Sequence, residues 1–254
     1  MYRDLPCTKI GAKGTREATD PVAEEVPVTV TVNGRQVATA MTSPEGLEEF
    51  ALGFLFTEGI IKGKGDIDSI QVEKTSVKII TKDLLRVVGP KRTVLSGCGG
   101  SSSFLDPSKL PRVTSPLTVE AGEISRLMKE LLRSDIHELT GGVHVVGLCR
   151  AGKVTEKAFD IGRHNALDRL AGRALIAGTD LGQAYVLSSG RISSEMVRKC
   201  LVAGIPLIAS RGATTTLAVG LAEKNGLTVI GFVRGGGMNI YTNPQRVTET
   251  IPAG

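Results

Sequence analysis

A single cysteine lies between glycines in the segment VLSGCGGSSS, residues 94–103. Gly97, Gly99 and Gly100 leave little side-chain bulk around Cys98 and permit backbone conformations with positive φ. Glycine amides can also surround an anion, and such a nest favours thiolate over thiol. Because packing gives a residue here little to do, we expect Cys98 to be an exposed thiolate with a chemical role. An incidental cysteine in a loop is the simpler alternative.

Three reactions are open to such a thiolate. Attack on a carbonyl needs a base, and none of His137, His144 and His164 is near Cys98 in sequence, although folding can bring one close. A metal site needs companion ligands, and no pair of cysteines has the spacing for one. Carriage of a sulfane sulfur needs only one exposed thiolate, so this chemistry fits the segment best.

The other cysteines have simpler explanations. Cys149 lies in the apolar run GGVHVVGLCR, and Cys200 lies on the apolar stripe of a predicted helix, so we expect both to be small core residues. Cys7 lies in a polar N-terminal arm, where we expect it to be inert.

Three further segments place an arginine beside glycine at the start of a helix or the end of a strand. They are FDIGRHNALDRL (159–170), SSGRISSEMV (188–197) and FVRGGGMNIY (232–241). Helix N-termini and arginine suit phosphate, and ligands of open α/β sheets collect at the carboxyl ends of strands. We therefore expect Arg163, Arg191 and Arg234 to converge on one anionic, nucleotide-sized ligand.

For residues 159–170 an Asn or Asp helix cap with surface charges is an equally good interpretation. No segment matches a P-loop or the G-x-G-x-x-G fingerprint, so ATP hydrolysis and NAD binding are unsupported.

The elements that must position these residues form two patterns. Residues 26–41 alternate valines around Asn33-Gly34 and predict a hairpin. Residues 42–61 predict a capped amphipathic helix that ends near Gly59, and residues 67–82 predict two more strands. From residue 116 a helix is followed by alternating strands and helices, which is typical of a layered α/β domain. We predict an irregular arm (1–25), a small α+β domain ending in the cysteine loop (26–115) and a larger α/β domain (116–254).

Composition sets wider limits. The chain has 254 residues, 41% of them hydrophobic, and a net charge of +5, which weakly favours an anionic ligand. We expect no signal peptide, because residues 1–17 lack an apolar run, and no membrane helix. A cytoplasmic protein with reduced thiols is therefore expected.

The sequence resembles the FdhD/NarQ family of formate dehydrogenase accessory proteins almost from end to end. The segments DIGRHNALD and SGRISSEMV are distinctive of that family, and the match also includes VPVTVTVNGRQVATAM, AGIPLIASRGATTTLAVGLA and GFVRGGGMNIYT. The resemblance implies a sulfur carrier that accepts persulfide sulfur from a cysteine desulfurase. It then passes the sulfur to molybdenum bis(molybdopterin guanine dinucleotide), a bound substrate, before this cofactor enters formate dehydrogenase.

The resemblance also assigns residues and partners. Cys98 would carry the persulfide, and Phe232, Val233, Arg234, Gly235, Gly236 and Gly237 would line the cofactor site, with Arg163, His164 and Arg191 as further candidates. A guanine nucleotide would mimic part of the cofactor. It further implies a cytidine deaminase-like fold for the larger domain and a homodimer, with no metal ion of its own, no nucleic acid and no membrane as partners.

One departure from the family pattern matters. The family loop reads Cys-Gly-x-Cys-Gly, whereas here Ser101 takes the place of the second cysteine. A disulfide within the loop is therefore impossible, although a relay through one thiol is not. Two other functions compete. A zinc deaminase lacks its ligands in this sequence, whereas a chaperone that binds the cofactor or apo-formate dehydrogenase without moving sulfur stays open.

Overall fold

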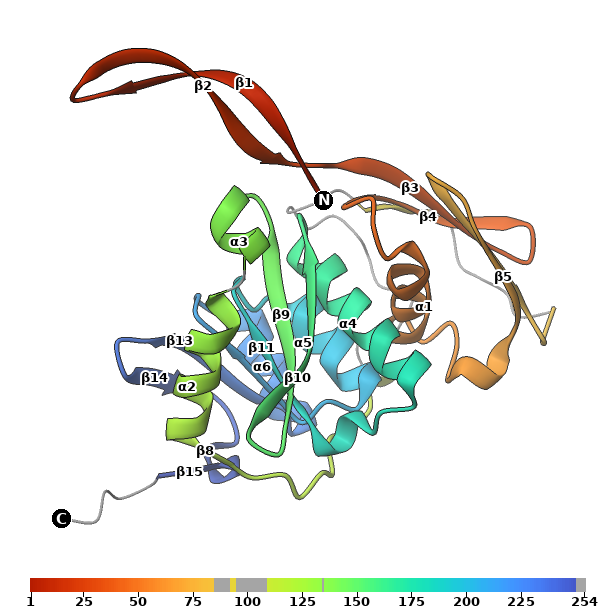
Figure 1. The fold of residues 1–254 in the computed structure, drawn as a ribbon. Helices are drawn as coiled ribbons and strands as arrows, with labels where there is room; N and C mark the ends of the chain where they lie inside the picture. The colour runs from red at the N-terminus through yellow and green to blue at the C-terminus, as the bar shows by residue number, and fades with distance from the viewer. Residues whose placement is uncertain (85–91, 95–108, 134, 250–254) are drawn as a thin grey trace.

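The computed structural model describes residues 1–84, 92–94, 109–133 and 135–249. It forms a layered α/β body with one projecting arm (Figure 1). Cys98 lies outside the described residues.

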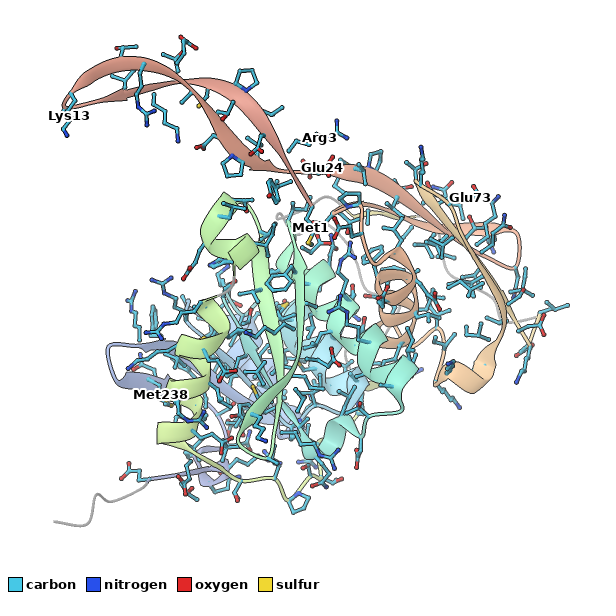
Figure 2. The ribbon with its side chains drawn as sticks, viewed as in Figure 1. Met1, Arg3, Lys13, Glu24, Glu73 and Met238 are labelled. Atoms are coloured by element: carbon cyan, nitrogen blue, oxygen red, sulfur yellow. The ribbon has the colours of Figure 1, made fainter. Side chains whose placement is uncertain are left out.

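The arm is a regular β-hairpin, so the prediction of an irregular segment at residues 1–25 is wrong. Strands β1 (Tyr2–Gly11) and β2 (Gly14–Ala23) pair antiparallel along their whole length. The hairpin stands clear of the body with Lys13 at its tip (Figure 2). Both of its faces are largely exposed, so it lacks the alternation of buried apolar residues by which a strand is recognised. Backbone pairing and cross-strand ion pairs, such as Lys9 with Asp20, hold it together.

Residues 26–94 contribute a five-stranded sheet in the order β5-β6-β3-β4-β7. Its elements are β3 (Val26–Val32), β4 (Arg35–Thr42), α1 (Leu47–Thr57), η1 (Lys64–Asp66), β5 (Ile67–Val72), β6 (Ser76–Thr81) and β7 (Arg92–Val94). The predicted hairpin and strands are confirmed, and Asn33 and Gly34 take the turn with φ of 50° and 76°.

Helix α1 is the one element of this unit whose predicted character is wrong. It begins after Gly46 without any side-chain cap, and it is buried on nearly every side. The reason is its position between two layers, because its apolar residues pack on the five-stranded sheet while its other side meets α4.

The larger sheet has six strands in the order β10-β9-β11-β12-β13-β14, with β11, β12 and β13 parallel. The strands are β9 (His144–Arg150), β10 (Lys153–Asp160), β11 (Tyr185–Ser188), β12 (Leu207–Ser210), β13 (Thr228–Arg234) and β14 (Gly237–Ile240). Strand β9 is buried on both faces, as its apolar run predicts.

Helices cover both faces of this sheet. One face packs on α4 (Arg163–Ala177), α5 (Ser194–Ala203) and α6 (Thr216–Asn225), and the other on α2 (Ala121–Leu132). The remaining described elements are α3 (Asp135–Thr140), η3 (Leu181–Gln183), η4 (Pro244–Arg246) and the short parallel pair β8 (Val119–Glu120) and β15 (Val247–Thr248).

We call the five-stranded sheet with α1 the small unit, and the six-stranded sheet with its helices the larger unit. The two units meet where α1 crosses α4 (Figure 1). A Cβ atom on Gly53 would lie 1.7 Å from the Asp168 carbonyl oxygen, and one on Gly172 would lie 1.9 Å from that of Glu49. Glycine at both positions therefore lets the helices touch through their backbones.

The mixed α/β class is confirmed, whereas the cytidine deaminase likeness and the domain boundaries stay predictions. No helix in the described ranges is both long and apolar enough to cross a bilayer.

Candidate functional site

Polar turns gather at one end of the six-stranded sheet, which we call the carboxyl edge: the ends of β11, β12 and β13 with the N-termini of α4, α5 and α6. Ser188 Oγ accepts a hydrogen bond from Gly190 N at 3.1 Å, and Ser210 Oγ donates to Gly190 O at 2.6 Å. Ser193 and Thr215 cap α5 and α6 with their hydroxyls. The positive ends of these helix dipoles favour an anion at this edge.

A pocket of about 450 Å³ opens beside the carboxyl edge. Its walls come from the turn between β13 and β14, from the residue after β12, and from α2 and α3: Val233, Arg234, Gly235, Gly236, Arg211, Ser125, Met128, Lys129, Leu132, Arg133, His137 and Glu138. Four of these side chains are cationic and one is a carboxylate. The pocket therefore suits an anionic ligand with an apolar part.

The backbone is strained at Phe232, directly before the glycine turn that lines this pocket. Phe232 has a φ of 55°, which is rare for an aromatic residue, and its N–H donates to Gly212 O at 2.9 Å rather than to β14. The Arg234 guanidinium lies 5.1 Å from the centre of the Phe232 ring. Strain of this kind is commonly retained at functional sites, and here it turns Val233 and Arg234 toward the pocket.

A smaller pocket of about 180 Å³ adjoins the first, because both are lined by His137 and Arg211. Its other walls are Gly141, Gly142, Val143, His144 and Ser189. His137 Nδ1 lies 2.7 Å from Val143 O. Since a carbonyl only accepts, Nδ1 carries the proton and Nε2 is an acceptor when the ring is neutral.

His144 is held as a neutral ring in the same pocket. Its Nδ1 lies 3.3 Å from Ser189 Oγ, and burial, with Arg163 close by, lowers the pKa of His144. A neutral imidazole can donate or accept a hydrogen bond to a bound ligand without adding charge.

The structure brings only part of the predicted site together. Val233, Arg234, Gly235 and Gly236 line the larger pocket, Phe232 lies directly before them and Gly237 begins β14. Arg191 is exposed and lines neither pocket, nor do Arg163 and His164. The start of α4 turns inward, so Arg163 lies outside both pockets, and the convergence of Arg163, Arg191 and Arg234 on one anionic ligand stays a prediction.

The burial of His164 shows that the start of α4 faces the interior. It is 8% exposed, and its Nε2 lies 2.9 Å from Ser193 Oγ. Burial, with Arg163, Lys199 and Arg198 nearby, lowers the pKa of His164 to about 2, so the neutral ring accepts the serine proton. The alternative of a capped helix with surface charges is also wrong, since Gly162 occupies the N-cap position and Asp168 and Arg169 are buried.

Arg169 and Asp168 belong to two separate but similar clusters of buried polar side chains, which lie between the small unit and the helices of the larger sheet. In the first, which we call the edge junction, Thr42 Oγ1 donates to Asp160 Oδ2 at 2.6 Å and Arg169 Nε donates to the same oxygen at 2.7 Å.

In the second, the inner junction, Thr57 Oγ1 donates to Asp168 Oδ1 at 2.6 Å and Lys199 Nζ donates to it at 2.9 Å. Every side chain in both junctions is almost fully buried.

Several lining residues were missed by sequence reasoning: Lys129, Arg133, His137, His144, Ser189 and Arg211. Arg211 had a signal, because Arg211-Gly212 follows β12 just as Gly190-Arg191 follows β11. The residues of α2 and α3 had none, since they reach the pocket from a distant part of the chain through the packing of α2 on the sheet.

The described cysteines agree with the predicted core roles of two of them. Cys149 and Cys200 are fully buried, and burial raises the pKa of each thiol to about 12. Neither is a thiolate near neutral pH. Cys7 is half-buried in the hairpin.

Comparison with known proteins gives one consistent result. The model of the FdhD/NarQ family matches residues 23–248. A protein of Listeria innocua named sulfur carrier protein FdhD is 38% identical over 246 residues, covering 92% of this chain and 94% of the relative. A protein of Bacillus subtilis with the same name is 35% identical over 240 residues and covers 91% of each chain.

A solved structure agrees with these relatives. A protein of Desulfotalea psychrophila, provisionally described as a formate dehydrogenase accessory protein, superposes with a TM-score of 0.82 at 27% identity, over 97% of this chain and 99% of its own. The predicted family is confirmed: this chain belongs to the FdhD/NarQ family.

Proposed function

We propose that this protein is a sulfur carrier that serves a formate dehydrogenase. Relatives named sulfur carrier protein FdhD and a likeness to a formate dehydrogenase accessory protein support this role. The observation that carries the proposal in the structure is the cationic, glycine-lined pocket at the carboxyl edge. It offers a place for a large anionic acceptor of the sulfur.

Cys98 receives the sulfur in this proposal. Its thiolate attacks the outer sulfur of a persulfide on a cysteine desulfurase, the S–S bond of the donor breaks, and the donor cysteine leaves as a thiolate. Cys98 then carries the persulfide, with no net oxidation or reduction. One thiol is enough for this exchange, so Ser101 is no obstacle.

The acceptor in this proposal is molybdenum bis(molybdopterin guanine dinucleotide), bound as a substrate. A reduced molybdenum centre takes the outer sulfur and supplies the two electrons that turn it into sulfide, and Cys98 leaves as a thiolate. Arg211, Arg234, Lys129 and Arg133 would bind the phosphates of this ligand. A guanine nucleotide should occupy the same pocket as a mimic.

Chain connectivity supports transfer at this edge. Strand β7 pairs in parallel with β4, with Val94 opposite Ala40, and Thr42 at the end of β4 bonds to Asp160. Cys98 follows Val94 by four residues, and four residues span at most about 14 Å. The last described residue before Cys98 therefore belongs to the strand that pairs with β4, and the end of β4 is bonded to the end of β10.

The remaining features rest on family resemblance. We include in the proposal a cytoplasmic homodimer, a cysteine desulfurase as donor, formate dehydrogenase as client, and a cytidine deaminase-like larger unit.

A chaperone that binds the cofactor without moving sulfur is the second candidate. The replacement of the second loop cysteine by Ser101 favours it, and the pocket alone would suffice for it.

Intact-protein mass spectrometry separates the two functions. Wild type and Cys98→Ala are each incubated with a cysteine desulfurase and cysteine, and are then treated with a reductant. The proposal predicts a reducible gain of one sulfur atom on wild type alone. An unmodified wild type, beside a two-cysteine relative that is loaded in parallel, would favour the chaperone.

A further inference from the structure

The carboxylate of Asp160 is a hub between the small unit and the carboxyl edge. It is completely buried at the end of β10 and accepts hydrogen bonds from five donors. These are Thr42 Oγ1 (2.6 Å), Ser43 N (3.2 Å), Gly162 N (3.0 Å), Asn165 Nδ2 (3.0 Å) and Arg169 Nε (2.7 Å). Two donors come from the last residue of β4 and the residue after it, and three come from the N-cap and the first two turns of α4. One carboxylate therefore fixes these two segments against each other.

Further bonds make the same connection rigid. Asn165 Nδ2 also donates to Met41 O at 2.8 Å, and Arg169 donates to Ser43 O at 2.6 Å and to Gly46 O at 2.9 Å. A guanidinium holds several acceptors at once because its donors form a planar fork. The backbone of residues 41–46 thus has a fixed position relative to α4.

Both segments lead to parts of the proposed reaction. Residues 38–40 of β4, shortly before the junction residue Thr42, pair with β7, and β7 is the last described strand before Cys98 in the chain. On the other side, a Cβ on Gly190 would lie 3.0 Å from Arg163 Cβ and 3.0 Å from His144 Nδ1. His144 lines the smaller pocket. The edge junction therefore connects β4, and through it β7, with the wall of the smaller pocket.

We infer that Thr42, Asp160 and Arg169 are positioning residues for sulfur delivery: they set where the segment bearing Cys98 leaves the small unit relative to the pocket. This inference rests on the proposed function. None of the three need touch the reacting atoms.

The inner junction supplies a matched control. Thr57, Asp168 and Lys199 repeat the arrangement of threonine, aspartate and cation, with the same threonine–aspartate distance of 2.6 Å and similar burial. It joins the end of α1 to the middle of α4 and to α5, away from β4 and β7. Thr42→Val and Thr57→Val each remove one buried hydroxyl of nearly the same volume and environment.

The test measures how well a ligand in the pocket meets Cys98. Guanosine diphosphate carrying a chloroacetamide arm is bound to the protein in a Cys7→Ser background. Cys98 Sγ attacks the chloromethyl carbon, a C–S bond forms, chloride leaves, and the thiol proton passes to water. The labelling rate, divided by that with free chloroacetamide, gives an effective molarity, which reports position rather than stability.

The expected results differ between the junctions. Thr42→Val should lower the effective molarity about tenfold, Thr42→Ser should restore most of it, and Thr57→Val should leave it unchanged. Melting temperatures should fall similarly in both valine variants. If Thr42→Val does not fold, Asn165→Ala removes another bond between β4 and the hub and should also lower the effective molarity.

Two failures can be told apart. If wild type shows no nucleotide-dependent labelling of Cys98, the proposed pocket and carrier role fail together. If wild type is labelled and Thr42→Val keeps the wild-type effective molarity, as Thr57→Val does, the positioning role alone is overturned.

Discussion

The edge junction and the inner junction contain the same three kinds of side chain, but they fix different parts of the molecule. At the edge, Arg169 spreads its donors over Asp160 and the backbone carbonyls of residues 43–46. At the inner junction, the Lys199 ammonium is a single point charge. Its Nζ lies 2.9 Å from Asp168 Oδ1 and 3.2 Å from Glu58 Oε1. Arg169 therefore orders a loop, whereas Lys199 joins helices, together with Arg198, which donates to Thr57 O and Glu58.

This difference shows that the role of a buried ion pair depends on which segments of the backbone its two side chains connect. Such pairs contribute little net stability compared with a well-packed apolar substitute, yet breaking one is costly. The inner junction is explained by packing the two units together. The edge junction does the same and also fixes β4, the strand that pairs with β7, against α4.

Removing the cations should give the largest effects. Arg169→Met and Lys199→Met each leave a buried carboxylate without its counter-charge, which should cost about 3–5 kcal/mol of the free energy of unfolding. Urea unfolding of both variants measures this cost. A loss below about 1 kcal/mol in either would mean that its junction relaxes to admit water, and the two could no longer be treated as equivalent in stability.

The helix crossing between the junctions should be almost as sensitive. Gly172→Ala places a Cβ 1.9 Å from the Glu49 carbonyl oxygen, so α1 and α4 must separate, at a cost of about 3 kcal/mol. Gly220→Ala in α6, where a Cβ meets nothing within 4 Å, is the control and should be neutral or slightly stabilising. Equal stability of the two variants in thermal unfolding would show that the crossing is looser than this contact implies.

Binding at the pocket should distinguish Arg211 from Arg191. Arg211 lines both pockets, whereas Arg191 is exposed and lines neither. Arg211→Ala should weaken guanosine diphosphate binding about 10- to 100-fold, because a charge-assisted hydrogen bond is worth about 1.5–3 kcal/mol. Arg191→Ala should change it less than threefold. Isothermal titration calorimetry of both variants measures this, and a larger effect at Arg191 would move the ligand away from the pocket.

Acidification should weaken the start of α4 through His164. The unfolded chain binds a proton at this ring near pH 6.5, whereas the folded chain does not until about pH 2. Acid therefore favours unfolding, by about 1 kcal/mol between pH 7 and pH 5.5. His164→Gln keeps an acceptor for Ser193 and should remove that part of the pH dependence. Chemical unfolding at both pH values checks it, and an unchanged slope would assign the dependence to other groups.

Much of the fold was predictable because it depends on local periodicity. The alternating valines of β3 and the apolar run of β9 indicate strands whatever surrounds them. The N-terminal hairpin was missed because neither of its faces is buried, so its strands carry no apolar alternation. The strand-end arginine at Arg234 was also predictable, since a glycine turn after a strand is visible in sequence.

The rest could not be predicted because it depends on how layers pack. Asp168 and Arg169 have the polar character of an exposed helix face, and only the crossing of α1 over α4 buries them. Lys129 and His137 reach the pocket from α2 and α3, about 100 residues before the glycine turn they face. No spacing in the sequence shows that these elements share one edge.

The most direct test of the account follows the sulfur itself. Cys98 of wild type is loaded with radioactive sulfur by a cysteine desulfurase, and the protein is added to an extract that contains inactive formate dehydrogenase and its molybdenum cofactor. We predict that the label moves from the protein to the cofactor as activity appears, and that Arg211→Ala keeps the label. Activation of the dehydrogenase while the label stays on Cys98 would contradict the carrier role and support a chaperone.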